Sequence, residues 1–156
     1  MKLYFSPGAC SLAPHIVLME AGFAFDLEKV DIPNKKTASG ADYWQINPKG
    51  YVPALQLDNG EVLSEVSTIL QYLADQKPAS GLVPAAGTMA RYRMMEALNF
   101  IATEVHKSVG ALFNPAMTPE MKEVQKAYIA RRFNALDRML AGKPFFTGNA
   151  FRVADA

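Results

Sequence analysis

The chain has 156 residues, of which half are apolar and a fifth are charged, a composition typical of a folded globular protein. The formal net charge is +1 and no basic run could neutralise a row of phosphates, which argues against nucleic acid as a partner. No apolar stretch approaches the roughly 20 residues that cross a bilayer, so no membrane partner is expected. A single cysteine, eight methionines and no signal pattern favour a reducing, cytoplasmic location.

Hydrophobic periodicity predicts an α/β domain in the first part of the chain. The predicted order is a strand at 2–5, a helix at 11–21 with Leu12, Ile16 and Met19 on one side, a strand at 25–31, a polar loop at 33–40, a helix at 41–46, strands at 53–57 and 61–63, and a helix at 65–76. Asn59-Gly60 is expected to supply the positive φ angles of a hairpin turn. This βαβαββα order is typical of a thioredoxin-like topology.

A change in composition predicts a second domain. Residues 78–88, in a stretch rich in Pro, Gly, Ala and Ser, are interpreted as a linker between a domain at 1–77 and a helical domain at 89–156. Long helical patterns at 89–109 and 119–140 predict a helical bundle, so the fold class is α/β followed by all-α. Because residues 153–156 resemble the opening turn of another helix, we expect the native chain to continue beyond Ala156.

Cys10 follows a turn formed by Ser6-Pro7-Gly8 and immediately precedes the first predicted helix, which begins at residue 11. Helix-terminal N–H groups there would stabilise an anion such as a thiolate, which makes Cys10 a candidate nucleophile or thiolate contact. The alternatives are that Cys10 is a small buried apolar residue and that Ser11 only caps the helix. The single cysteine and two distant histidines lack metal-ligand spacing, and no metal is expected.

Two further segments have the chemistry of a peptide-binding site. A cis bond before Pro53 would leave the backbone of Val52 able to pair with an extended peptide, although a turn proline is the alternative. Ser64-Glu65 precedes a helix, so the N–H groups of Glu65 and Val66 could hold a carboxylate while the acid of Glu65 faces an amine. An N-cap followed by a first-turn acid would explain the same residues.

In the long helix of the second predicted domain, four polar residues share one face at about 100° per residue. These residues are Asn99, Thr103, His106 and Lys107. Met94, Leu98, Ile101 and Val105 lie opposite and are predicted to form the core stripe. The polar face is either solvated or, if another surface covers it, part of a site.

Together these residues resemble the bacterial beta class of glutathione S-transferases. The resemblance is carried by the segments at 4–12, 47–55, 71–75, 98–101, 104–107 and 151–156, with a Cys rather than a Tyr at the first helix. It covers the whole chain. It implies a glutathione transferase in which the glutathione thiolate attacks electrophilic small molecules, with possible peroxidase activity, in a cytoplasmic homodimer that serves detoxification.

The resemblance also implies a role for each site residue. Cys10 would contact or link to the glutathione sulfur, with Ser11 and His106 as the other catalytic residues. The residues implied to bind glutathione are Cys10, Lys35 at the glycyl end, Tyr51, Val52 before a cis Pro53, Glu65 and Val66 at the γ-glutamyl end, Asn99 and Thr103 across a dimer interface, and His106 and Lys107 beside the sulfur.

Two residues depart from the family pattern, and two other functions stay open. Val66 replaces a Ser or Gly, so only its backbone can bind, and Arg152 replaces the Ser or Thr of a capping box with Asp155. The first alternative function is a glutathione-dependent thiol-disulfide oxidoreductase acting through Cys10, with glutathione as the resolving thiol. The second is a non-catalytic protein that binds apolar ligands.

Overall fold

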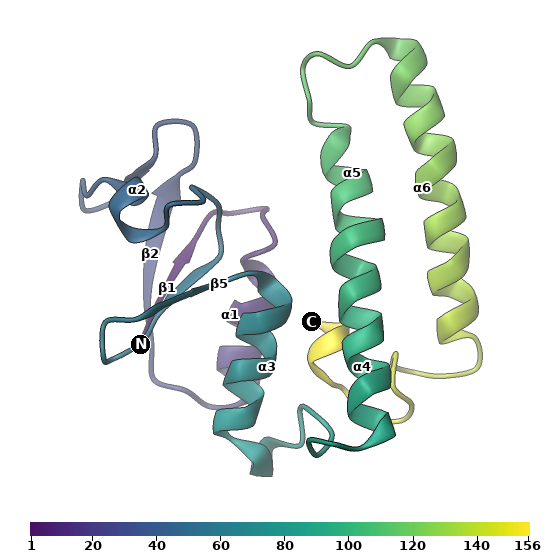
Figure 1. Cartoon of the computed structure of the whole chain (residues 1–156), viewed down its shortest axis with the longest axis horizontal. Coiled ribbons are helices and arrows are strands. Elements are labelled where there is room, and N and C mark those ends of the chain that lie inside the picture. The colour runs from purple at the N-terminus through teal and green to yellow at the C-terminus, as the bar shows by residue number, and fades with distance from the viewer. The chain divides into compact units, whose positions relative to one another are not determined.

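The computed structural model describes all 156 residues of the chain. Residues Met1–Val83 form one compact unit and Pro84–Asp155 form another. None of the helices is both long and apolar enough to span a membrane. Figure 1 shows the helices and strands of each unit.

The first unit is built on a five-stranded mixed sheet with the order β3-β2-β1-β4-β5. The strands are β1 (Lys2–Phe5), β2 (Asp26–Asp31), β3 (Lys36–Thr37), β4 (Ala54–Gln56) and β5 (Val62–Ser64). Only β1 and β2 are parallel, while the other neighbouring pairs are antiparallel. The helices are α1 (Leu12–Glu20), α2 (Tyr43–Ile46) and α3 (Val66–Gln76), followed by the 3-10 turn η1 (Pro78–Ser80). This is the predicted thioredoxin-like arrangement, which confirms the fold class.

The core lies on both faces of this sheet because successive strand residues point to opposite sides. One face carries a cluster of Tyr4, Val30, Tyr43, Val52 and Ala54, which places α2 against the strands. On the other face α1 packs beside α3, as Figure 1 shows. These two buried layers fix α2 to one face of the sheet and α1 and α3 to the other, which holds the loops at the strand ends in place.

The buried side of α1 differs from the predicted one. Leu12 and Met19 are 60% and 65% exposed, so the expected apolar side of this helix is wrong. Pro14, Val17 and Leu18 are buried instead. Because the helix is apolar nearly all round, periodicity alone does not select its inner face. The stripe with i, i+3, i+4 spacing that begins at Pro14 is the one that packs on the sheet.

Two local features were missed by the sequence analysis. The polar loop predicted at 33–40 contains β3, whose two residues pair with Val30 and Asp31 of β2. A two-residue strand is too short to display alternation, which explains why it escaped detection. In the hairpin between β4 and β5 only Gly60 has a positive φ, of 88°, so the prediction for Asn59 is wrong. Asn59 instead accepts the N–H of Glu61 through its side chain at 3.0 Å.

The second unit consists of a long helical segment and an antiparallel partner (Figure 1). Helix α4 (Met89–Phe100) continues through a π-helical segment, η2 (Ile101–His106), into α5 (Lys107–Ala111), and α6 (Pro119–Leu140) packs against α5 and η2. Met94 and Leu98 of the predicted core stripe are buried, whereas Ile101 and Val105 are only half-buried. The six π-helical residues change the angle per residue, so the predicted spacing of 100° does not hold through η2.

The last residues form the short 3-10 turn η3 (Val153–Asp155). Asp155 accepts hydrogen bonds from the backbone N–H groups of Arg152 at 2.9 Å and Phe146 at 2.7 Å. The acidic half of the capping box is therefore intact although Arg152 stands at its first position. Asp155 also accepts the N–H of Phe146 and so ties two turns together. This second hydrogen bond compensates for the missing Ser or Thr at position 152, and the spacing alone does not predict it.

Candidate functional site

The turn between β1 and α1 is closed by a serine side chain. Ser11 Oγ donates to the carbonyl of Ser6 and accepts the N–H of Ser6, each at 3.2 Å. Ser11 is 1% exposed and occupies the N-cap position of α1, but its side chain makes no capping hydrogen bond, so the prediction that it only caps the helix is wrong for the side chain. Its hydroxyl shapes the loop that carries Cys10, and its proposed catalytic role stays a prediction.

Cys10 lies next to a residue far away in sequence. Its Sγ is 3.5 Å from the carbonyl oxygen of Val52, with the geometry of a weak hydrogen bond. The Val52–Pro53 peptide bond is cis, as the resemblance implies. Cys10 follows β1 and Val52 precedes β4, and these two strands are paired. The fold thus places the only thiol of the chain beside the peptide segment that was predicted to pair with a ligand.

Two buried side chains hold the peptide group that precedes Val52. Tyr43 Oη and Asn47 Nδ2 each donate to the carbonyl of Tyr51 at 2.8 Å. Burial raises the pKa of Tyr43 to about 12, so its hydroxyl keeps its proton and remains a donor at any physiological pH. The side chain of Tyr51 is 66% exposed. No hydrogen bond of the structure uses the N–H of Val52, which leaves this donor for a ligand.

Lys35 is held in an unusual backbone conformation near this segment. Its φ is 53°, and its carbonyl accepts the N–H of Tyr43 at 2.8 Å. Its Nζ donates to the carbonyl of Gly50 at 2.8 Å and lies 5.3 Å from the ring centroid of Trp44. The ammonium group therefore has neutral partners only, and its positive charge remains for an anionic ligand.

Glu65 is the other non-glycine residue with a positive φ, at 72°, and it immediately precedes α3. Such conformations are costly and recur at functional sites. The N-cap residue Glu65 makes no side-chain cap on α3. The N–H groups at the start of a helix, here including that of Val66, have no partner within the helix. The carboxylate of Glu65 lies 2.8 Å from Nζ of Lys49, and both side chains are more than half exposed.

Four predicted site residues lie in the second unit. Asn99, Thr103, His106 and Lys107 are all exposed along the segment that runs from α4 through η2 to α5. The hydroxyl of Thr103 donates to the carbonyl of Asn99 at 2.9 Å, which places these two residues one turn apart on one side. A π-helical segment often marks a functional position in a helix.

Four residues of the first unit that support this arrangement had no predicted role: Tyr43, Trp44, Asn47 and Lys49. Asn47 and Lys49 belong to the segment at 47–55 that carried the resemblance, and that membership was the available signal. Tyr43 and Trp44 gave no signal, because an aromatic pair in a short helix is typical of an ordinary core.

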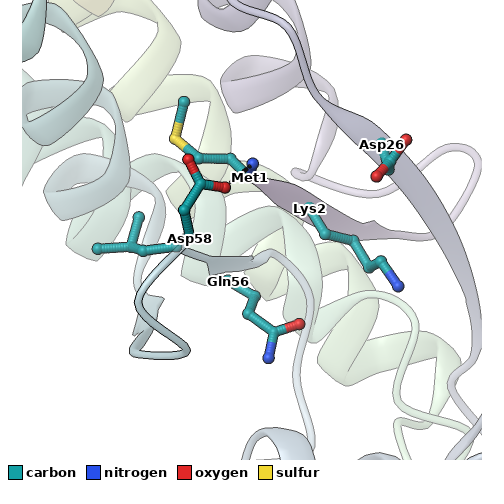
Figure 2. Close-up of a pocket in the computed structure, with 6 residues that line it drawn as sticks. Met1, Lys2, Asp26, Gln56 and Asp58 are labelled. Atoms are coloured by element: carbon teal, nitrogen blue, oxygen red, sulfur yellow. Dashed lines mark hydrogen bonds and ion pairs between the residues drawn. The ribbon is translucent and has the colours of Figure 1, made fainter.

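A separate shallow pocket of about 170 Å³ lies at the opposite end of the sheet and is shown in Figure 2. It is lined by Met1, Lys2, Asp26, Gln56, Leu57 and Asp58. The terminal ammonium of Met1 is paired with Asp58 there. Since Cys10 and Val52 lie near the other end of β1, this pocket is distinct from the candidate site. No group of three or more His, Cys, Asp and Glu side chains is arranged to hold a metal ion.

The mixed sheet, the cysteine before α1 and the cis Val52–Pro53 bond define a thioredoxin-like domain. The glutathione S-transferase N-terminal domain family matches residues 8–76. Glutathione S-transferase GstA of Escherichia coli O157:H7 is 43% identical over 156 residues, which cover this whole chain and 78% of that protein. The chain therefore belongs to the glutathione S-transferase family.

Solved structures agree with this assignment. A sphingomonad glutathione S-transferase complexed with glutathione is 51% identical with a TM-score of 0.94, over 99% of this chain and 77% of that one. A bacterial beta-class glutathione S-transferase of Sphingomonas chungbukensis is 47% identical with a TM-score of 0.94, over the same shares of the two chains. These similarities confirm the resemblance to the bacterial beta class.

Proposed function

We propose that the chain is a glutathione transferase that holds glutathione along the end of β4, with the sulfur beside Cys10. The observation that carries this proposal is the 3.5 Å separation between Cys10 Sγ and the Val52 carbonyl oxygen. A cysteinyl residue that pairs with the Val52 backbone as an added strand has its own side chain in this neighbourhood. The fixed carbonyl of Tyr51 and the unused N–H of Val52 support that pairing.

The two ends of the tripeptide match the charges at either side of Val52. The glycyl carboxylate would bind the ammonium of Lys35, which has no carboxylate partner in the structure. The γ-glutamyl carboxylate would bind the N–H groups at the start of α3, including that of Val66, where the helix dipole favours an anion. The γ-glutamyl amine would bind the carboxylate of Glu65, which already pairs with an ammonium group, that of Lys49.

The residues of the second unit complete this proposal. Asn99 and Thr103 would contact glutathione across the interface of a homodimer, and His106 and Lys107 would border the sulfur. All four side chains are exposed in their own unit, which a contact with a ligand or a partner requires. We further propose a cytoplasmic location and a role in detoxification, in keeping with a thiol chemistry that needs a reducing compartment.

The proposed reaction begins with glutathione held as its thiolate. The sulfur forms a bond to an electrophilic carbon, the leaving group departs with the electron pair of the broken bond, and the thiol proton goes to solvent. Each unit by which the site lowers the pKa of the glutathione thiol stabilises the thiolate by about 1.4 kcal/mol. The thiol of Cys10 is the donor proposed to act in that direction, because the Ser11 hydroxyl and the N–H groups of Leu12 and Ala13 at the start of α1 are already hydrogen-bonded within the turn. Reduction of a peroxide by two glutathione molecules, giving the disulfide, an alcohol and water, uses the same thiolate.

A thiol-disulfide oxidoreductase is the second candidate, because Cys10 itself lies where the glutathione sulfur is expected. In that reaction Cys10 forms a mixed disulfide with glutathione, and a second glutathione thiolate releases it as glutathione disulfide. A protein that only binds apolar ligands is the third. Calorimetry with glutathione, followed by assays with a panel of aryl halides, epoxides and peroxides, distinguishes the transferase from the protein that only binds. Turnover supports the transferase, whereas binding without turnover of any electrophile contradicts it.

A further inference from the structure

Lys35 is held at three points within the first unit, one through its backbone and two through its ammonium group. Its backbone carbonyl accepts the N–H of Tyr43 at 2.8 Å, which ties the residue to the start of α2. Its ammonium group donates to the carbonyl of Gly50 at 2.8 Å. The same ammonium lies 5.3 Å from the ring centroid of Trp44, within the usual range of a cation–π contact. A long flexible side chain is thus confined before any ligand arrives.

The indole of Trp44 depends on a glycine for its place. A Cβ added to Gly50 would lie 2.7 Å from two ring carbons of Trp44, closer than non-bonded carbon atoms approach. Gly50 also has a φ of 65°, which disfavours other residues. The ring therefore packs directly on the backbone of Gly50, whose carbonyl is the other partner of Lys35. We call Trp44 and Gly50 together the lysine cradle.

Burial alone does not explain Trp44. Its side chain is 48% exposed, and it lies on a four-residue helix whose first turn is capped by Asp42, which accepts the N–H of Trp44 at 3.0 Å. An exposed indole contributes less to a core than a buried aromatic residue does. The ring instead lies close to the backbone of Gly50, and the ammonium of Lys35 lies over it.

We propose that Trp44 is a positioning residue that holds the ammonium of Lys35 for the carboxylate at the glycyl end of glutathione. The inference rests on the proposed function. It makes Trp44 a determinant of specificity for thiol peptides that end in an ionised carboxylate. A confined cation loses less conformational entropy when it binds an anion than a mobile one does, so the cradle favours such peptides over their esters and amides.

The test compares two peptides on the full chain: glutathione and its glycyl ethyl ester, which lacks that negative charge. Trp44→Leu is expected to raise the dissociation constant and the KM for glutathione about three- to tenfold, with kcat nearly unchanged. Binding of the ester is expected to change less than twofold. In a Lys35→Met background, Trp44→Leu should have almost no further effect on glutathione binding, since the ammonium it positions is gone.

Two matched variants separate positioning from general destabilisation. Trp44→Phe keeps an aromatic face and is expected to stay within about twofold of the wild type. Phe133→Leu removes an aromatic side chain of similar exposure, 50%, from α6 and is expected to leave binding unchanged. Equal losses for glutathione and its ester, or an undiminished effect of Trp44→Leu in the Lys35→Met background, would overturn the inference. Failure of the wild type to bind glutathione would instead overturn the proposed function.

Discussion

Cys10 Sγ lies 3.5 Å from the carbonyl oxygen of Val52, although 42 positions separate the two residues in the chain. The turn at Ser6–Ser11 presents the thiol, and the pair Tyr43 and Asn47 holds the peptide group before Val52. This juxtaposition places the only thiol of the chain beside the backbone segment that is proposed to pair with glutathione.

Replacing Cys10 with Ala distinguishes the transferase from the oxidoreductase. If the glutathione sulfur is the nucleophile, kcat/KM for conjugation should fall by less than about tenfold, because Cys10 supplies only one contact to the thiolate. Mass spectrometry should show that the mixed disulfide with glutathione no longer forms. Cys10→Ser, which keeps a hydrogen-bond donor, should lie between the wild type and Cys10→Ala. Loss of all conjugation in both variants would assign the covalent role to Cys10.

Glu65→Gln removes the carboxylate proposed to bind the γ-glutamyl amine. Glutathione should bind about ten- to a hundredfold more weakly, the usual contribution of a hydrogen bond between charged groups. The free energy of unfolding should change by less than about 1 kcal/mol, because the Lys49–Glu65 pair is exposed. Glu96→Gln breaks an equally short exposed pair with Arg93 at 2.8 Å and serves as the control. Equal binding by both variants would remove Glu65 from the site.

Tyr43→Phe deletes one of the two donors to the Tyr51 carbonyl. The protein should lose about 1 to 2 kcal/mol of stability to urea, and its KM for glutathione should rise severalfold with little change in kcat. Tyr4→Phe also removes a hydroxyl from a tyrosine of the same core cluster, one that donates to Gln56 at 3.1 Å. That control should lose stability without a change in KM. A KM shift of the same size in both variants would mean that packing, not the Tyr51 carbonyl, is responsible.

The raised pKa of Tyr43 predicts a loss of stability in alkali. The phenol titrates near pH 10 in the unfolded chain and at about 12 in the folded protein, so the unfolded state releases its proton first. The stabilisation from this group is complete below pH 10 and is lost as the pH rises towards 12, by an amount of about 1 to 3 kcal/mol. Urea unfolding of the wild type and of Tyr43→Phe between pH 9 and about 12 checks this. The variant should show a shallower decline, and parallel curves would contradict the assignment.

The elements that the sequence analysis placed best carry strong local signals. The helix predicted at 119–140 matches α6 in both its ends, because Thr118 caps it and Pro119 occupies its first turn. Strand β1 also has the predicted bounds. The contact between Cys10 and Val52 was not predicted, because the resemblance implied only a separate glutathione contact for each residue and no local pattern reports a contact between two loops.

The features that escaped the sequence depend on packing in three dimensions. The π-helical turn at Ile101–His106 has no residue pattern that distinguishes it from an ordinary helix. The role of Trp44 follows from its contact with the backbone of Gly50, which no periodicity encodes. Lys49 was read as part of a motif, but its pairing with Glu65 appears only when the loop and the start of α3 are seen together.

A crystal structure of the chain with glutathione tests the central claim most directly. Both the N–H and the carbonyl of Val52 should lie within hydrogen-bond distance of the cysteinyl backbone, and the glutathione sulfur should lie within about 4 Å of Cys10 Sγ. A tripeptide bound elsewhere on the chain, or a sulfur directed away from Cys10, would contradict the account.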